Sequence, residues 1–443
     1  MKLTDLLLIA LHIVLAFVIY YVPVAAKLYA TGLIAFVFFI SFTARDPKVL
    51  LYTSAYVVGA EVFTRMTKGL FFYESHKYLI MILALAYIFR RGLKKTSFIF
   101  ALYLVLLVPG ILKTLFIEAN DPSYLIESIR KTILFNLAGP LALGLAAMAW
   151  VKEELSLEEF KRLNFWMLLP VILMVTYMIL QTPSLGDIIF TTSSNKALSG
   201  GFGPNQTATI LGLGMFASLV LLLTEKNIIS KLIYFFLLSI ITYRAFLTFS
   251  RGGTITGIII ILIFIYVSWR SEFRFMKTKS FIGIAIASLI ISFSFYIAME
   301  ITGGLILNRY LGKNRLGEQK DITSGRIIIF LTEMEIFLEN PFLGTGIGRA
   351  KIERKKYLGV AIATHNEISR LLSEHGLFGI LALLVLFFAP FLTGAYRKNN
   401  LFFYPYFAFW LLTISHSSMR LAASAALYGF ALLNLYFYDN SDM

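Results

Sequence analysis

The sequence predicts an all-α fold, a polytopic transmembrane helix bundle of about 12–14 helices with one large helical extracytoplasmic loop. Of the 443 residues, 58% are hydrophobic and only 15% are charged, which is less charge than a soluble domain of this length carries. The apolar residues occur in runs that approach the roughly 20 residues a spanning helix needs. A backbone in lipid must satisfy its own hydrogen bonds, so these runs are predicted to be helices.

Fourteen apolar segments meet or approach the spanning length, and several are short enough that two could merge or lie in the interface. They fall near residues 5–22, 28–43, 49–63, 78–89, 96–112, 131–150, 164–181, 205–224, 230–248, 252–269, 280–299, 376–394, 401–417 and 421–437. The first run lacks a small-residue cleavage pattern, so it is expected to remain as a membrane helix.

Basic residues in the connections predict the orientation. The densest short basic run, Arg90-Arg91-Gly92-Leu93-Lys94-Lys95, is expected on the cytoplasmic side. Alternation from there places both termini in the cytoplasm and the long segment 300–375 outside. Four regions follow from this pattern: N-terminal helices (1–199), central helices (200–299), the outer loop (300–375) and C-terminal helices (376–443).

The net charge of +15 serves first as a topology signal, because the basic residues lie mostly between apolar runs. A second interpretation is attraction to anionic headgroups or phosphates. The chain has no cysteine, which excludes disulfides and thiolate metal sites. No set of histidines has metal-ligand spacing, so no metal or cofactor is expected.

The outer loop contains two helix-like stretches, 324–339 and 365–375, on either side of the glycine-rich segment 344–348. The second stretch is expected to begin at Thr364 as N-cap and to end at Gly376. At helical spacing, His365 shares the inward face with Ile368, Ser369 and Leu372. The charged side chains of Glu367, Arg370 and Glu374 are then expected to face water.

His365 is the candidate general base. A helix N-terminus disfavours the protonated imidazole, and a base must be neutral near pH 7. The alternative is a partly buried histidine that caps the helix. His375 lies about 15 Å further along the helix axis, and the isolated His12, His76 and His416 are interpreted as structural.

Two arginines are candidate anion ligands. Arg251 lies in Ser250-Arg251-Gly252-Gly253 between two membrane helices, where small neighbours let a ligand approach the backbone and a guanidinium suits a diphosphate. The alternative is an arginine that reaches toward the lipid interface. Arg326 opens the amphipathic stretch that ends at Asn340-Pro341, and the alternative for that stretch is a helix lying on the membrane surface.

Four further residues are candidate substrate-binding residues, and two of them also have a structural interpretation. Asn205 in Gly203-Pro204-Asn205 is also a candidate helix N-cap. Arg244 is otherwise an interface anchor, and Asn366 and Arg349 complete the set. Within the spans, Glu61 is the clearest charged residue and lies near the end of a short segment, and a carboxylate inside a membrane span is a functional candidate.

Five motifs in order resemble the O-antigen ligase and polymerase superfamily over roughly residues 200–395. They are Gly203-Pro204-Asn205, Ser250-Arg251-Gly252-Gly253, Ser324-Gly325-Arg326, the segment Asn340 to Gly346, and Thr364-His365-Asn366 followed by Glu374-His375-Gly376. The family's usual helix count is 12, and the first half of this chain matches only as a membrane bundle.

The resemblance implies a bacterial inner-membrane enzyme with a periplasmic active site. It implies that a glycan on undecaprenyl diphosphate is moved to a sugar hydroxyl, commonly on the lipid A core, without nucleotide or metal. His365 matches the family's catalytic histidine, and Arg251 and Arg326 match the arginines that engage the diphosphate. Attack opposite the diphosphate would invert the anomeric centre.

Three alternatives remain open from the sequence. A repeat-unit polymerase shares the arginine–histidine pattern and differs in its acceptor, a second lipid-linked repeat. A transporter or flippase would show inverted repeats and charges at mid-membrane, of which few are seen. An assembly factor without chemistry would retain full glycan transfer after loss of His365.

Overall fold

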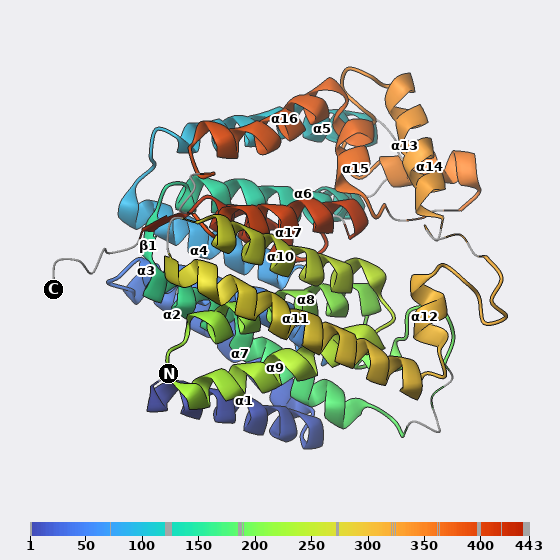
Figure 1. Ribbon diagram of the computed structural model, residues 1–443. Helices are drawn as coiled ribbons and strands as arrows, with labels where there is room; N and C mark the ends of the chain where they lie inside the picture. Colours follow the sequence, from blue (N-terminus) through green and yellow to red (C-terminus); the bar gives the residue numbers. More distant parts are fainter. Residues whose placement is uncertain are drawn as a thin grey trace.

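The computed structural model is a bundle of long, roughly parallel helices with a smaller helical cap at one end (Figure 1). It describes residues 2–70, 72–119, 126–184, 188, 190–271, 274–319, 321, 323, 325–360, 362, 364–396, 400–417 and 419–436. The predicted all-α fold is confirmed, since the strands of the described chain are two short segments that pair in parallel.

The bundle helices follow the predicted segments. Their bounds are α1 Leu3–Tyr21, α2 Val24–Thr43, α3 Lys48–Met66, α4 Ser75–Arg91, α5 Ser97–Ala119, α6 Ile126–Trp150, α7 Leu157–Gln181, α8 Pro204–Thr224, α9 Ile228–Leu247, α10 Arg251–Arg270, α11 Arg274–Ile301, α16 Leu377–Leu392, α17 Phe403–His416 and α18 Ala422–Ala431. Each of the 14 predicted segments overlaps one of these helices. The described residues thus have a bundle helix for each predicted segment, whereas the number of these helices that cross a membrane stays a prediction.

Within the described residues, nine helices are long and apolar enough to cross a membrane: α1, α2 and α5 to α11. The remaining bundle helices are shorter or carry charges, like the pair Glu61 and Arg65 in α3. These two side chains bond each other at 2.6 Å, and Glu61 also accepts from Ala422 N at 2.7 Å. Glu61, noted in the sequence as a charged residue within a span, is buried and therefore ties α3 to the start of α18.

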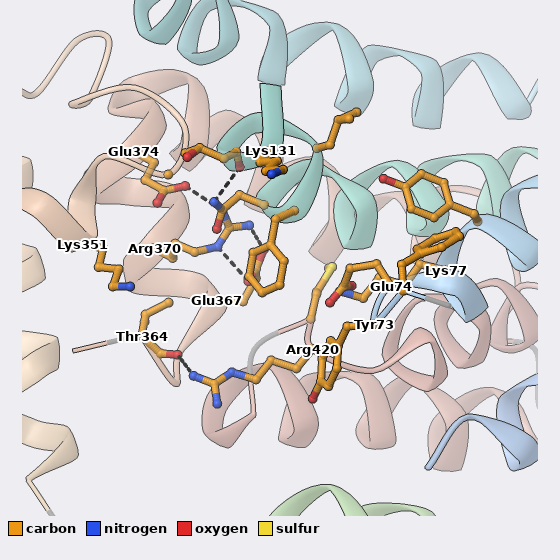
Figure 2. A pocket seen from close by; sticks show the side chains of 18 of the residues that line it. Tyr73, Glu74, Lys77, Lys131, Lys351, Thr364, Glu367, Arg370, Glu374 and Arg420 are labelled. Carbon is orange, nitrogen blue, oxygen red and sulfur yellow. Dashed lines mark hydrogen bonds and ion pairs between the residues drawn. The ribbon is translucent and has the colours of Figure 1, made fainter. Parts of the chain in front are cut away.

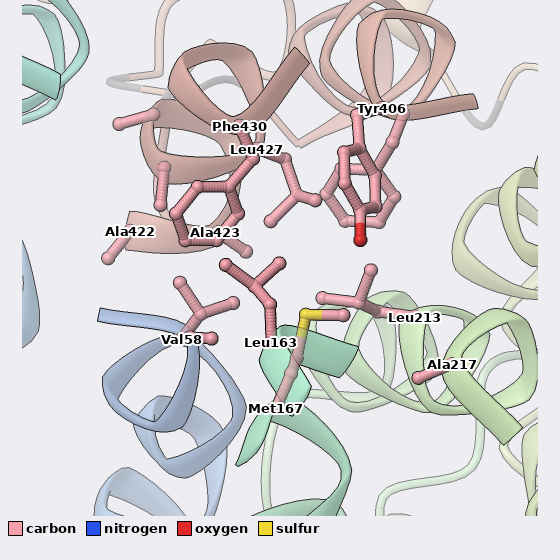
Figure 3. Close-up of a cluster of buried hydrophobic side chains, with 14 of the residues drawn as sticks. Val58, Leu163, Met167, Leu213, Ala217, Tyr406, Ala422, Ala423, Leu427 and Phe430 are labelled. Atoms are coloured by element: carbon pink, nitrogen blue, oxygen red, sulfur yellow. The ribbon is translucent and has the colours of Figure 1, made fainter. Parts of the chain in front are cut away.

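Helix α8 forms the centre of the bundle. Every residue of its most apolar window is buried, and it packs against α7, α9 and α10. Figure 3 shows the adjoining core, where Val58 of α3, Leu163 of α7 and Leu213 of α8 meet side chains of α17 and α18. This rigid centre fixes the ends of α8, α10 and α17 relative to one another.

The cap is built from the predicted outer loop and contains more helices than the sequence indicated. Its elements are α12 Leu305–Tyr310, α13 Arg326–Glu339, α14 Ala350–Leu358 and α15 Glu367–His375. The two predicted helical stretches correspond to α13 and α15. The cap lies at one end of the bundle, and the short 3-10 turn η2 (Ala197–Ser199) precedes α8.

The opposite end of the bundle holds Lys2 and the strand pair β1 (Glu154–Ser156) and β2 (Asn434–Tyr436). Glu154 pairs with Asn434, Leu155 with Leu435 and Ser156 with Tyr436. The strands join the start of α7 to the chain that follows α18. Both described chain ends therefore lie at the end away from the cap.

Candidate functional site

Arg251 is the first residue of α10 and lies where three helix ends are tied together. The hydroxyl of Ser250 donates to Asn205 Oδ1 at 3.1 Å, and Asn205 Nδ2 donates to the carbonyl of His416 at 3.3 Å. The predicted N-cap role of Asn205 is wrong, because Gly203 is the N-cap of α8 and Pro204 is its first residue. Asn205 instead links the ends of α8, α10 and α17.

The glycines after Arg251 serve helix packing. A Cβ on Gly253 would lie 2.3 Å from Thr209 N and 2.4 Å from Ala208 C, both backbone atoms of α8. A Cβ on Gly252 would lie 2.6 Å from a ring carbon of His416. Small residues at helix crossings allow this close approach. The glycines therefore bring α10 against α8 and His416, which differs from the predicted opening for a ligand.

Three arginines converge at the cap end of the bundle: Arg251, Arg326 at the start of α13, and Arg309 on α12. Burial lowers the pKa of Arg326, and the neighbouring charges of Arg251 and Arg420 lower it further. Burial likewise lowers the pKa of Arg309, followed by the charges of Arg251 and Arg326. Such mutual repulsion creates a region that favours an anion. Ser324 of the predicted motif lies outside the described residues.

His365 lies in the turn just before α15, so its predicted position on the helix is wrong. Asn366 is the N-cap, and its side chain accepts from Ile368 N at 2.8 Å and from Ser369 N at 3.4 Å. Thr364, the predicted cap, accepts instead from Asn366 N at 3.2 Å. An Asn N-cap two residues further on is as favourable as Thr.

The charged residues of α15 are buried, which contradicts the expectation that they face water. The guanidinium of Arg370 bonds Glu374 at 2.6 Å and also bonds Glu367. The exposed fractions of these three side chains are 5% or less. The carboxylates of Glu367 and Glu374 neutralise the guanidinium of Arg370 within α15. These three side chains can therefore be buried against α5 and do not need to face solvent.

His365 is held neutral by its surroundings. Burial lowers the pKa of its imidazole to about 4, and the charges of Arg420, Arg326, His416 and Arg354 act in the same direction. Its Nδ1 atom is buried and has no hydrogen-bond partner in the part of the chain described. A neutral imidazole with an unused ring nitrogen can accept a proton at neutral pH.

Glu333 of α13 holds the segment around His365 in place. Its carboxylate pairs with Arg354 of α14 and accepts from the hydroxyls of Thr364 and Ser369. Arg354 also donates to the carbonyl of Ile362 at 2.9 Å. One fully buried carboxylate therefore joins α13, α14, α15 and the turn before α15.

Arg420 is a site residue that the sequence analysis missed. It lies between α17 and α18, and its Nη2 donates to the carbonyl of Thr364 at 2.8 Å. Arg65 in turn donates to the carbonyl of Arg420 at 3.1 Å. The sequence showed only that Arg420 is a basic residue in a short outer connection, and such residues commonly lie at the membrane interface without a role in a site.

The other predicted substrate-binding residues, Arg244, Arg349 and Asn366, either lie away from Arg251 and Arg326 or have side chains that already bond protein atoms. Arg244 is buried and its Nη2 donates to Met178 O, Thr182 Oγ1 and Leu198 O, at 3.2, 2.8 and 3.0 Å. Arg349 precedes α14 near Lys113 of α5. These contacts favour structural roles for Arg244 and for the cap residue Asn366.

A cavity of about 850 Å³ adjoins the turn that carries His365 (Figure 2). It lies between α4, α6, α15 and the 348–354 segment, and Thr364 and Arg420 are in its wall. Six basic and three acidic side chains line it: Lys77, Lys131, Lys351, Arg354, Arg370 and Arg420, with Glu74, Glu367 and Glu374. The side chains of His365, Arg251 and Arg326 are not part of this lining.

No group of three or more histidine, aspartate or glutamate side chains is placed to hold a metal ion among the described residues. The convergent groups are guanidinium and imidazole groups, which bind phosphate oxygens and exchange protons. The geometry thus resembles an anion site next to a base.

An O-antigen ligase family model, Wzy_C, matches residues 233–384. The match supports the O-antigen ligase superfamily. The matched range contains Arg251, Arg326 and His365, whereas Asn205, His416 and Arg420 lie outside it. No curated protein matches the chain. The O-antigen ligase match supports, in general terms, a ligase or polymerase type of function in a multi-pass membrane protein.

Proposed function

We propose that this protein transfers a glycan from undecaprenyl diphosphate to a hydroxyl of an acceptor, as O-antigen ligases do. The observation that carries the proposal is the convergence of Arg251, Arg326 and His365 from three separate segments at one end of the bundle. The O-antigen ligase match over this range supports a glycosyltransferase-like enzyme with a lipid-linked glycan and an acceptor as partners.

The proposed chemistry is a single displacement. The acceptor oxygen forms a bond to the anomeric carbon while the bond from that carbon to the diphosphate oxygen breaks. The leaving diphosphate keeps the electron pair, and His365 takes the acceptor's proton. Positioned proton transfer of this kind contributes about 10²–10⁴-fold to a rate. Attack opposite the leaving group inverts the anomeric configuration, and NMR of the product tests this stereochemistry.

Arg251 and Arg326 would bind the diphosphate, with Arg309 beside them. Guanidinium groups fit phosphate oxygens in a bidentate geometry. Fixed positive charge stabilises the negative charge that develops on the leaving group. Donor binding also relieves the repulsion among the three arginines, since the diphosphate neutralises them.

We place the acceptor in the 850 Å³ cavity, because Thr364 and Arg420 connect its wall to His365. The acceptor expected from the resemblance is the lipid A core, and a second lipid-linked repeat is the polymerase alternative. Both acceptors belong in the same assay, since they present a hydroxyl to the same base.

The test is transfer by purified protein in lipid vesicles, with a lipid-linked glycan, each acceptor in turn, no ATP and a chelator present. We expect His365→Ala to lose about 10²–10⁴-fold of the rate, and Arg251→Ala and Arg326→Ala to lose transfer as well. The control is Arg270→Ala, an exposed arginine at the other end of α10 from Arg251. Full transfer by a correctly folded His365→Ala variant would refute the proposal.

A further inference from the structure

A second cavity lies at the end of the bundle away from the cap. Its volume is about 1300 Å³, it is open on one side, and residues of α1, α2, α3, α7, α8 and α9 and of their connections line it. Cavities for small ligands are roughly 300–1,000 Å³. This cavity therefore has room for a larger molecule than a metabolite.

The walls of this cavity are apolar and aromatic. Helix α1 packs mainly on α7, whereas α2 packs mainly on α4, so a space remains between the two N-terminal helices. Leu33 and Phe36 of α2 face it, with Phe165 and Trp166 of α7. A Cβ on Gly32 would meet nothing within 4 Å. The space is thus bounded by side chains that suit hydrocarbon.

At the inner end of the cavity, three polar side chains of the lining form hydrogen bonds within the protein. His12 Nε2 bonds the hydroxyl of Tyr56 at 2.9 Å, and that hydroxyl bonds the hydroxyl of Tyr29 at 3.0 Å. His12 Nδ1 bonds the carbonyl of Leu8 at 2.7 Å. Because these polar groups already bond one another, a ligand at that end of the cavity leaves no buried polar atom without a hydrogen bond.

The mouth of the cavity carries charges of both signs in nearly equal number. Among the described residues, four basic side chains line it, Lys2, Lys161, Arg162 and Lys226, and five acidic ones, Asp5, Asp46, Glu158, Glu159 and Glu225. Two tyrosines, Tyr52 and Tyr234, belong to the same lining, and the guanidinium carbon of Arg162 lies 6.0 Å from the centroid of the Tyr52 ring. Tyrosines are typical of the boundary between lipid and water.

We propose that this cavity binds one diacyl phospholipid with a zwitterionic phosphate–ammonium headgroup. The acyl chains fill the space beside Gly32, and the headgroup lies at the mouth, where basic groups face its phosphate and acidic groups its ammonium. A headgroup with only negative charge would meet a mouth that already has five acids against four bases. The proposal is independent of glycan transfer, because it concerns the other end of the bundle.

The experiment is native mass spectrometry of the full-length protein released from vesicles with equal amounts of phosphatidylethanolamine and phosphatidylglycerol. We expect one retained phosphatidylethanolamine per chain, favoured by about fivefold or more, the ratio that about 1 kcal/mol produces. Gly32→Phe fills the space and is expected to abolish retention. The matched control is Phe39→Trp on the same helix, a position that is 62% exposed and outside the cavity lining.

Thermal unfolding gives a second measurement that separates lost binding from lost folding. A ligand that binds only the folded state raises the Tm by mass action, so added phosphatidylethanolamine should raise the Tm of wild type and Phe39→Trp but not of Gly32→Phe. Glu158→Gln changes a carboxylate whose side chain is 78% exposed and should reduce the lipid preference. Equal retention of both lipids, or retention by folded Gly32→Phe, would overturn the proposal.

Discussion

His365 illustrates how the surroundings of one residue determine its chemistry. An unperturbed histidine titrates near pH 6.5, whereas burial and four nearby cationic or titratable groups lower the pKa of His365 to about 4. The imidazole is therefore largely neutral at neutral pH. His375 also lies in the cap with an unpartnered ring nitrogen. That nitrogen packs against Gly110 of α5, and burial and a single arginine, Arg370, lower the pKa of His375.

The lowered pKa of His365 predicts the pH dependence of transfer. The base must be neutral, so kcat/KM should fall only as the pH drops through about 4, instead of near 6.5. In kcat the acid limb should appear at higher pH, because the bound diphosphate adds negative charge that favours the imidazolium. The measurement is the pH profile of both parameters between pH 3.5 and 8, a range chosen to bracket the two values.

Arg420 supplies the matched variant for this profile. Its positive charge is the largest electrostatic cause of the lowered pKa of His365, so Arg420→Gln should move the acid limb to higher pH. The control Arg270→Ala, an exposed arginine at the far end of α10, should leave the limb in place. An unchanged limb in Arg420→Gln would mean that a group other than His365 sets it.

The residues of the site were predictable from sequence only where a motif marked them. Arg251, Arg326 and His365 stand in short patterns that resemble a family. Arg251 acts electrostatically on Arg326, and Arg326 on His365, which indicates that they lie near one another, and their catalytic roles stay predictions. Arg420 and Arg309 stand in no such pattern. Their positions depend on how α12 and the α17–α18 connection pack, which involves contacts between residues far apart in the chain.

At the scale of elements, Glu333 joins three helices of the cap to the turn before α15. Glu333→Gln keeps an acceptor oxygen but leaves Arg354 buried without its carboxylate. Breaking a buried pair from one side costs about 3–5 kcal/mol. We expect the cap to open before the bundle does, with faster proteolysis of the 300–375 segment and a lower kcat.

Limited proteolysis and circular dichroism of Glu333→Gln measure these two effects separately. The control is Glu353→Gln on α14, whose partner Lys356 has a side chain that is 67% exposed. Exposed pairs of this kind contribute about 0–1 kcal/mol. Equal protease resistance of the two variants would show that Glu333 does not secure the cap.

The crossing of α8 and α10 depends on glycines. A Cβ on Gly253 would lie 2.3 Å from Thr209 N, so Gly253→Ala must push the two helices apart and should cost about 1–3 kcal/mol. Gly32→Ala is the control, because a Cβ there meets open space. Thermal unfolding in detergent should show a lower Tm for Gly253→Ala alone.

Helix existence was predicted from sequence more successfully than helix ends. The apolar segments of the sequence predicted the bundle helices, because a backbone in lipid must form helical hydrogen bonds along the whole apolar segment. The ends depend on local competition between neighbouring caps: Asn366 displaces Thr364, and Gly203 with Pro204 displaces Asn205. The burial of Arg370 was missed because its two carboxylates come from its own helix and neutralise it.

At the scale of the whole molecule, the two cavities lie at opposite ends of one bundle. The 850 Å³ cavity adjoins the cap, and the 1300 Å³ cavity lies at the end with β1 and β2. The bundle between them is a continuous buried core. Because the apolar helices are long enough to cross a membrane, we expect the cap and the strand pair to face opposite sides of it.

Cysteine labelling tests that orientation directly, because the chain has no cysteine of its own. Leu316 in the outer segment is 82% exposed, and Lys95 lies exposed in the basic connection between α4 and α5. A membrane-impermeant maleimide should label Leu316→Cys in bacteria whose outer membrane has been permeabilised. Lys95→Cys should react only after the inner membrane is also opened, since basic connections favour the cytoplasm. If Lys95→Cys reacts first and Leu316→Cys reacts only after the inner membrane is opened, Arg251, Arg326 and His365 lie on the cytoplasmic side. They would then be separated from any glycan acceptor on the outer face.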